Sequence, residues 1–272
     1  MRSKPEKHSK YGDRRERKAS SAGPPDQTPV SVVYGVLPVV EALKASTRRI
    51  DRIYIADGAK ENRLRQILDL CRERSIAWSK VPASQFSKFV DPSVNHQGVL
   101  ALIASAGYSS VEEILSGAPS PALILILDGV EDPRNLGAIL RVADGAGVHG
   151  VIIPERRAVG LNDTVAKSSA GAIEHVRVAK APNLNRLIEE LKNGDIWVVG
   201  TSLDATSNYT EWDWTKPSAL VLGSEGHGLH RLVAEKCDIL VKIPMHGKID
   251  SLNVSVAAGV VLFEARRQRG RG

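Results

Sequence analysis

The chain contains very little of several residue types that characterise whole classes of protein. Only two cysteines, Cys71 and Cys237, occur in its 272 residues. Two distant cysteines form neither the disulfide framework of a small secreted protein nor a zinc cluster, and the histidines lack H-x-x-x-H spacing, so we expect no metal site. The longest strand-like apolar run, 122–127, is far shorter than the roughly 18–20 residues of a membrane span. The basic N-terminus lacks the apolar segment of a secretory signal, and the sequence therefore predicts a cytoplasmic protein.

What remains is the composition of a globular protein with a sizeable core. Hydrophobic residues make up 42% of the chain and charged residues 25%, and the length suggests two domains. The net charge is +6, and residues 1–30 hold eight basic against four acidic side chains. A second basic cluster lies at Arg266, Arg267, Arg269 and Arg271. Basic ends favour salt-sensitive contact with RNA, although a merely solubilising tail would have the same composition.

The hydrophobic pattern divides the chain into four parts. Residues 1–30 are rich in Lys, Arg, Ser and Pro and predict a disordered tail. Residues 31–104 alternate short strands and helices and predict a small α/β domain, and 105–120 predict a linker. Residues 121–272 predict a larger α/β domain with a buried parallel sheet. Its expected strands are 122–127, 151–153, 176–178, 197–200, 219–222 and 239–243; its expected helices are 136–145, 163–169, 184–192, 229–235 and 254–267.

Glycine-containing turns in this larger part exclude three common nucleotide and hydrolase sites. The turn after strand 122–127 has no G-x-G-x-x-G and places Pro133 and Arg134 where a pyrophosphate would approach the backbone. The densest glycine loop, 223–228, does not end in the Gly-Lys-Ser/Thr of a P-loop. It also lacks the spacing of a hydrolase nucleophile elbow. Readings that involve NAD, ATP or a catalytic serine are therefore weak.

Three polar clusters nevertheless follow three predicted buried strands. They are 128–141, 223–228 and 244–255. Ligands of open α/β sheets bind at the carboxyl ends of the strands, so three such clusters together indicate a ligand site. Taken singly, Asn135 and Asn253 are more often helix caps and Arg141 is more often a surface charge. Asp250 or Ser251 could cap the last helix, with Asn253 near its start.

The residues of these clusters resemble the three signature motifs of the TrmH-type RNA ribose 2′-O-methyltransferases, in the SPOUT superfamily. The first motif is 135–137 with Arg141, the second is 222–228, and the third is 243–245 with 251–255. Residues 31–104 resemble the accessory RNA-binding domain of that family at 34–35, 41–43 and 96–99. The layout is similar to the subgroup that methylates a guanosine ribose in large-subunit ribosomal RNA.

The resemblance implies the fold, cofactor and partners. The fold would be a trefoil-knotted parallel sheet with helices on both faces, preceded by a small α/β RNA-binding domain. The methyl donor would be S-adenosylmethionine, the partner ribosomal RNA, and the protein a homodimer through its last helix. The implied cofactor contacts are Thr201, Ser202, Leu203, Gly223, Ser224, Gly226, Gly228, Ile243, Pro244, Met245 and Leu252. Glycines let the backbone approach a ligand, while Ile243 and Leu252 would provide apolar walls.

The remaining motif residues would carry the chemistry. Arg141 matches the family's catalytic arginine and would grip the target phosphate or sugar; since a guanidinium keeps its proton, stabilisation of the forming alkoxide is its expected role. Asn135 and Asn253 would orient Arg141 or the substrate. Glu225 would accept a proton or hold the glycine loop, and Ser251 matches a further polar position. His96 and Gln97 would contact RNA or serve as turn formers.

Two other functions compete with this one. The first is a non-enzymatic RNA-binding or ribosome-assembly factor on the same scaffold; the complete set of Asn135, Arg141, Glu225, Ser251 and Asn253 argues against it. The second keeps the enzyme but makes transfer RNA the substrate, and the accessory domain favours ribosomal RNA over it.

Overall fold

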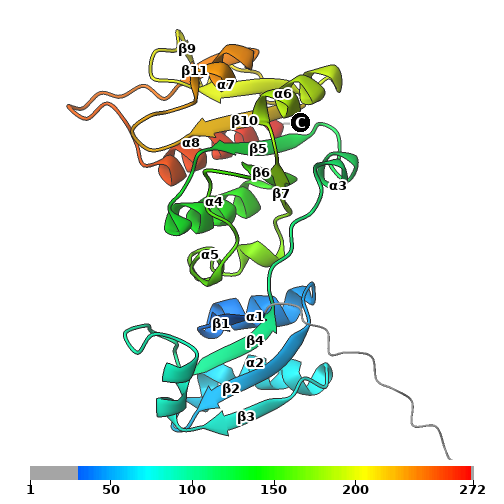
Figure 1. Ribbon diagram of the computed structural model, residues 1–272, viewed down its shortest axis with the longest axis vertical. Coiled ribbons are helices and arrows are strands. Elements are labelled where there is room, and N and C mark those ends of the chain that lie inside the picture. The colour runs from blue at the N-terminus through cyan, green and yellow to red at the C-terminus, as the bar shows by residue number, and fades with distance from the viewer. Residues whose placement is uncertain (1–29, 271–272) are drawn as a thin grey trace, which may run out of the picture.

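A computed structural model describes residues 30–270, apart from the side chains of residues 61 and 63. The expected disordered tail therefore lies outside the described residues, except for residue 30. The described chain forms two sheets, one in the N-terminal part and one in the C-terminal part (Figure 1). None of its described helices has the length and apolar character needed to cross a membrane. The cytoplasmic location stays a prediction.

The N-terminal sheet has four strands in the order β1-β4-β2-β3. The strands are β1 (Val30–Tyr34), β2 (Ile50–Ala56), β3 (Trp78–Val81) and β4 (Val99–Ala104). Apolar side chains of α1 (Val36–Ala45) and α2 (Glu61–Glu73) join one face of this sheet in the main core. Phe86 of the 3₁₀ helix η1 (Ala83–Lys88) packs on the other face. The sheet is thus covered on both sides.

The C-terminal sheet has seven strands, all parallel, in the order β7-β6-β5-β10-β8-β11-β9. They are β5 (Leu123–Asp128), β6 (Gly150–Pro154), β7 (Val178–Ala181), β8 (Trp197–Thr201), β9 (Ser207–Asn208), β10 (Ser218–Gly223) and β11 (Ile239–Lys242). The central strands β5 and β10 are buried along their whole length, because helices cover both faces. Their continuous apolar sequences are the reason that they could be predicted.

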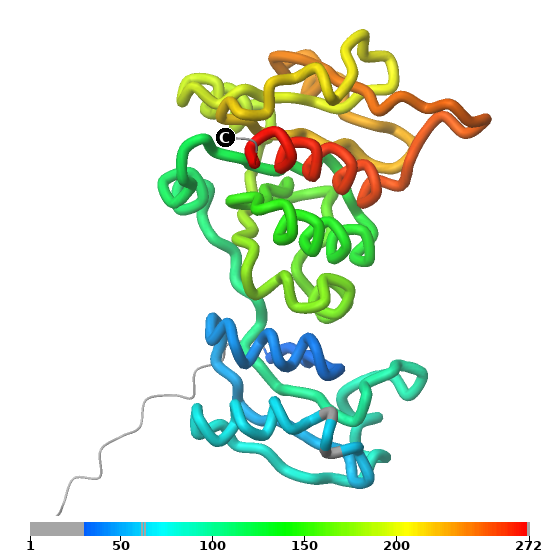
Figure 2. The backbone as a smooth tube through the Cα atoms, turned by 180° about the vertical axis from the view of Figure 1, so that it is seen from behind, coloured from blue at the N-terminus to red at the C-terminus, as the bar shows by residue number. Residues whose placement is uncertain are grey.

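Helices lie on the two faces of this sheet. The helices α4 (Pro133–Ala146) and α8 (Val254–Arg269) pack on one face and lie side by side (Figure 2). The helices α3 (Val111–Ser116), α6 (Leu184–Asn193) and α7 (Arg231–Lys236) pack on the other. From β11, near one edge, the chain returns to the middle of the sheet to form α8.

Three sequence predictions need correction. The strand expected at 176–178 is β7 at Val178–Ala181, because Val176 N–H bonds to Ala172 O at the end of the turn η2 (Ala172–Glu174). The cap of α8 is Asn253, whose Oδ1 accepts from Ser255 N–H at 2.9 Å, rather than Asp250 or Ser251. The short strand β9 was not expected, since Ser207 and Asn208 carry no apolar signal.

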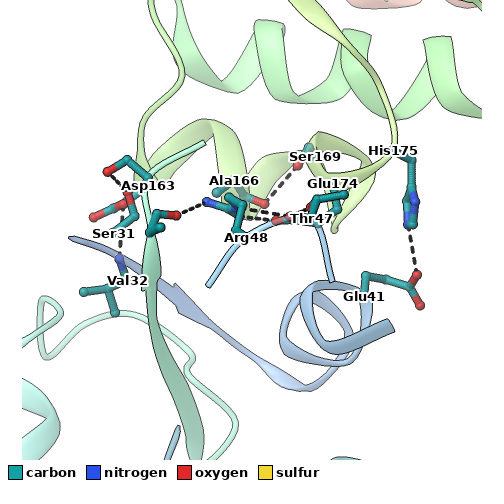
Figure 3. Close-up of polar contacts among 12 residues, drawn as sticks. Ser31, Val32, Glu41, Thr47, Arg48, Asp163, Ala166, Ser169, Glu174 and His175 are labelled. Carbon is teal, nitrogen blue, oxygen red and sulfur yellow. Dashed lines mark hydrogen bonds and ion pairs between the residues drawn. The ribbon is translucent and has the colours of Figure 1, made fainter. Parts of the chain in front are cut away.

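The two parts of the chain meet at a polar seam, shown in Figure 3. Arg48 pairs with Glu174, and their side chains are only 9% and 3% exposed. Thr47 Oγ1 also donates to Glu174 at 3.0 Å, and His175 Nε2 lies 3.2 Å from a carboxylate oxygen of Glu41. A buried ion pair whose polar atoms are bonded fixes geometry more than it adds stability. The seam therefore joins α1 and the residues after it to the segment around the turn η2.

Candidate active site

Three turns that are far apart in the sequence meet through one amide group. Asn253 Nδ2 donates to Asn135 Oδ1 at 3.1 Å and also to Glu225 Oε1. Asn135 lies in the first turn of α4, Glu225 in the loop after β10, and Asn253 at the cap of α8. The three predicted motifs are thereby joined in a single polar cluster, which we call the amide cluster.

The sheet explains this convergence. The strands β5 and β10 are adjacent and parallel, and Gly223 is paired with Asp128 at their last register position. The turns that follow them therefore leave the sheet at the same edge. The loop after β10 then folds tightly on itself, because Ser224 and Gly228 exchange two backbone hydrogen bonds of 3.0 Å. A side chain at Gly223 has no room there, since an added Cβ would lie 2.0 Å from the carbonyl carbon of Gly228.

A cleft of about 500 Å³ opens beside this loop. Its walls come from the ends of β8, β10 and β11 and from the segment before α8, which projects from the sheet in Figures 1 and 2. The predicted cofactor residues that line it are Thr201, Ser202, Leu203, Gly223, Ser224, Gly226, Gly228, Ile243, Met245 and Leu252. Pro244 lies instead in an adjoining groove that Ile243 and Met245 also line. Ser251 lines the cleft as well.

The lining of this cleft, which we call the donor cleft, suits an adenosine-containing ligand. Leu203 and Leu252 are 57% and 37% exposed, so apolar surface is available to cover an aromatic ring. The glycine loop offers backbone amides and carbonyls without intervening side chains, which suits a heterocycle edge and a ribose. The volume lies within the range of small-molecule sites. S-adenosylmethionine therefore fits the residues present.

Arg141 is not part of the amide cluster within one chain. Six residues along a helix correspond to about 240° of net rotation, so Arg141 and Asn135 lie on different sides of α4. Asn135 is 9% exposed, whereas Arg141 is exposed and has no hydrogen-bond or ion-pair partner between residues 30 and 270. Asn253 donates to both Asn135 and Glu225, and within one chain neither asparagine bonds to Arg141. That the two asparagines orient Arg141 or the substrate stays a prediction. The catalytic role of Arg141 stays a prediction.

His96 and Gln97 shape a turn of the N-terminal part. Gln97 has φ 54° and its Oε1 accepts from Val36 N–H at 2.8 Å. His96 Nδ1 accepts from Gly98 N–H at 3.1 Å, and its ring packs on Phe86 with 4.6 Å between centroids. These contacts account for both residues as turn formers. Contact of either side chain with RNA stays a prediction.

A second cleft, of about 580 Å³, adjoins the donor cleft. The two share Ser224, Glu225 and Gly228, and the second also includes Asn135 and His230. His230 is held by Asp128, whose carboxylate accepts from His230 N–H at 2.8 Å and lies 2.9 Å from Nδ1. The sequence pattern does not indicate this contact, because the two residues are 102 positions apart. The only signal was an aspartate at the end of a buried strand, which must find a donor.

Thiol and metal chemistry are not indicated by the described part of the chain. Burial raises the pKa of the Cys237 thiol to about 12, and burial also raises the pKa of Cys71. Both thiols are therefore poor nucleophiles near neutral pH. Within residues 30–270 no group of three or more His, Cys, Asp or Glu side chains could hold a metal ion.

Comparison with known proteins finds matches for both the N-terminal and the C-terminal part of the chain. Residues 122–263 match the model of the SpoU rRNA Methylase family, and residues 32–109 match the model for RNA 2′-O ribose methyltransferase substrate binding. YacO of Bacillus subtilis (strain 168), whose name places it in the TrmH family of tRNA/rRNA methyltransferases, is 45% identical over 240 residues. That alignment covers 87% of this chain and 95% of the relative.

Two solved structures have the same fold over most of their length. One is an RNA 2′-O ribose methyltransferase, with a TM-score of 0.76 and 30% identity, covering 89% of this chain and 90% of the other. The other is an AdoMet-bound rRNA methyltransferase from Sinorhizobium meliloti, with a TM-score of 0.72 and 28% identity, covering 88% and 87%. These neighbours confirm the predicted SPOUT fold.

The parallel sheet, the donor cleft and the amide cluster define an RNA methyltransferase that uses S-adenosylmethionine. The chain belongs to the SpoU rRNA Methylase family and, with a 45% identical relative of that name, to the TrmH family of tRNA/rRNA methyltransferases. The predicted family, enzyme class and cofactor are thereby confirmed.

Proposed function

We propose that this enzyme methylates the ribose 2′-hydroxyl of a guanosine in large-subunit ribosomal RNA. The match of residues 32–109 to a substrate-binding model for RNA 2′-O ribose methyltransferases supports an RNA ribose as the acceptor. The similar Sinorhizobium meliloti protein, which is an rRNA methyltransferase, supports ribosomal RNA. The observation that carries the proposal is the hydrogen bonding of Asn253 to both Asn135 and Glu225 beside the donor cleft.

Residues of the donor cleft would bind the methyl donor, and residues of the second cleft would bind the target nucleotide. Bound S-adenosylmethionine supplies an electrophilic methyl group on a sulfonium. The walls at Leu203, Ile243 and Leu252 would shield the donor from water, which strengthens electrostatic interactions at the reacting atoms. The amide cluster would hold the target sugar in line, and positioning of this kind supplies much of the rate. Arg141 would stabilise the negative charge that develops on the ribose oxygen.

We further propose a homodimer formed through α8. Val256 and Phe263 of α8 are 50% and 52% exposed. Phe263 lies against Gly145 of α4, where an added Cβ would be 3.4 Å from its ring. Arg141 lies one turn before Gly145 on the same side of α4. A second copy seated on α4 and α8 would cover this apolar face and place Arg141 within the interface.

Methylation assays with defined RNAs test the substrate. Tritiated donor is incubated with ribosomal RNA and with transfer RNA, and the labelled nucleoside is identified after digestion. Label at a guanosine 2′-oxygen of large-subunit RNA supports the proposal; label only in transfer RNA favours the alternative substrate. Donor affinity without transfer to any RNA would favour a non-catalytic factor. Sedimentation tests the dimer. The unchanged chain should sediment as a dimer and Phe263→Asp as a monomer; a monomeric unchanged chain would contradict the proposed dimer.

A further inference from the structure

We propose that His230 is the group that takes the proton from the target ribose hydroxyl, with Asp128 as its positioning residue. This inference rests on the proposed function and adds to it the identity of the proton acceptor. It is carried by the contact between these two side chains and by the position of His230 in the second cleft.

Asp128 holds the imidazole at two points. Its Oδ2 accepts from the backbone N–H of His230 at 2.8 Å, and its Oδ1 lies 2.9 Å from Nδ1 of the same residue. The Asp128 side chain is 6% exposed and the His230 side chain 54% exposed. A buried carboxylate beside Nδ1 fixes the proton on that nitrogen, which leaves Nε2 with a free lone pair. The exposed part of the ring therefore offers a proton acceptor to the cleft.

The second cleft places this acceptor next to the site of methyl transfer. Asn135 and Glu225 of the amide cluster line the same cleft as His230. The cleft also shares the glycine loop with the donor cleft, at Ser224, Glu225 and Gly228. A nucleotide seated in the second cleft would therefore have the amide cluster, the donor and the imidazole around its sugar.

Other groups near the site are weaker candidates for the proton. Arg141 carries a guanidinium, which does not lose its proton in proteins. Glu225 already accepts a hydrogen bond from Asn253, and carboxylates as a class are weak bases at neutral pH. Imidazole is the side chain whose ordinary titration range spans neutrality. Two imidazoles line the second cleft, and between residues 30 and 270 only that of His230 is held by another side chain, whereas His227 has no such contact.

The charged and titratable groups around the second cleft come from several elements. Besides Asp128 and His230 they are Glu131 and Asp132 before α4, Arg157 after β6, and Glu225 and His227 of the glycine loop. Of these groups, Asp128 is the one that touches the imidazole ring, and its side chain is buried.

The step balances in atoms and charge. The ribose oxygen forms a bond to the methyl carbon while the carbon–sulfur bond breaks, and the bonding pair stays on sulfur as a neutral thioether. The hydroxyl proton passes to Nε2 of His230, giving an imidazolium beside the Asp128 carboxylate. Solvent removes that proton after the product leaves, so no metal or redox partner is needed.

The test is His230→Gln, which keeps a donor toward Asp128 but cannot accept a proton. Single-turnover methylation of ribosomal RNA is measured from pH 5 to 9 with donor and RNA saturating. We expect a rate loss of about 10²-fold or more, the usual contribution of a general base. In the unchanged enzyme the rate should fall toward acidic pH, where imidazole is protonated; in the variant it should instead follow hydroxide concentration across the range. His175→Gln, which removes a histidine at the seam, serves as the matched control and should stay within twofold.

Two measurements without turnover complete the design. Calorimetry of donor binding should give unchanged affinity in His230→Gln. Nitrogen NMR of the donor-free protein should show the proton on Nδ1 of His230, and in Asp128→Asn the two tautomers should mix. Three results would each overturn the inference. The first is a methylation rate of His230→Gln within threefold of the unchanged enzyme, and the second is a rate that still falls toward acidic pH in that variant. The third is a proton on Nε2 of His230 in the unchanged protein. If the unchanged enzyme methylates no RNA, both the proposed function and this inference are wrong. If the unchanged enzyme methylates RNA and His230→Gln does so at the same rate, only this inference is wrong.

Discussion

Replacement of Asn253 by alanine should damage stability and activity together, because one side chain serves both. Its Oδ1 caps α8 by accepting from Ser255 N–H at 2.9 Å. Its Nδ2 donates to Asn135 at 3.1 Å and to Glu225. Asn135 is only 9% exposed, so alanine at 253 leaves a nearly buried amide oxygen without its partner.

The size of the stability loss follows from these two contacts. Loss of a helix cap costs about 1 kcal/mol. An unsatisfied buried acceptor costs about 1–3 kcal/mol. We therefore expect Asn253→Ala to lower the free energy of unfolding by about 2–4 kcal/mol, which for a chain of this size lowers the melting temperature by roughly 4–8 °C. Asn253→Ser keeps a capping oxygen but has no amide donor, so it should lose only the second contribution.

Urea unfolding followed by tryptophan fluorescence measures the stability of the three proteins, and single-turnover methylation measures their activity. Both variants should be slower than the unchanged enzyme by about 10²-fold or more, because misplacement of a reacting group by 1 Å can cost that much. Equal destabilisation by serine and alanine would show that the cap contributes nothing. Unchanged turnover in Asn253→Ser would show that the amide cluster does not position the substrate.

Three further changes test other parts of the site. Arg141→Ala should lower single-turnover methylation by orders of magnitude while calorimetry shows unchanged donor affinity, and Arg141→Lys should not restore the rate because the planar fork is lost; an active alanine variant would end that role. Gly223→Ala should abolish donor binding in calorimetry, since its Cβ would lie 2.0 Å from the Gly228 backbone, whereas Gly147→Ala, with φ 71° but open space, should cost only stability. Because the pKa of Cys237 is raised to about 12, only about one thiol in 10⁴ is ionised at pH 8. Mass spectrometry should therefore find Cys237 unalkylated by iodoacetamide in the folded protein and alkylated in denaturant; rapid alkylation when folded would refute the cause assigned to its pKa.

Most of the secondary structure could be predicted because burial leaves a pattern in the sequence. Strands covered on both faces, such as β5 and β10, must be apolar throughout and are therefore visible as continuous runs. Strand β9 could not be predicted, because two polar residues at a sheet edge carry no such pattern. Strand β7 was placed too early because Val176 is buried by a 3₁₀ turn, and burial alone does not distinguish a turn from a strand.

The sequence by itself determined which polar turns follow buried strands, and hence which residues gather at one edge of the sheet. Asn135, Glu225 and Asn253 could be named in advance because they match the motifs of a family, in turns that follow buried strands. Only the tertiary structure decided which atoms meet there: that Asn253 bonds to both other residues and that Asp128 holds His230. Periodicity along the chain fixes the side of an element on which a residue lies, whereas contacts between residues about 100 positions apart depend on strand order and on packing between layers.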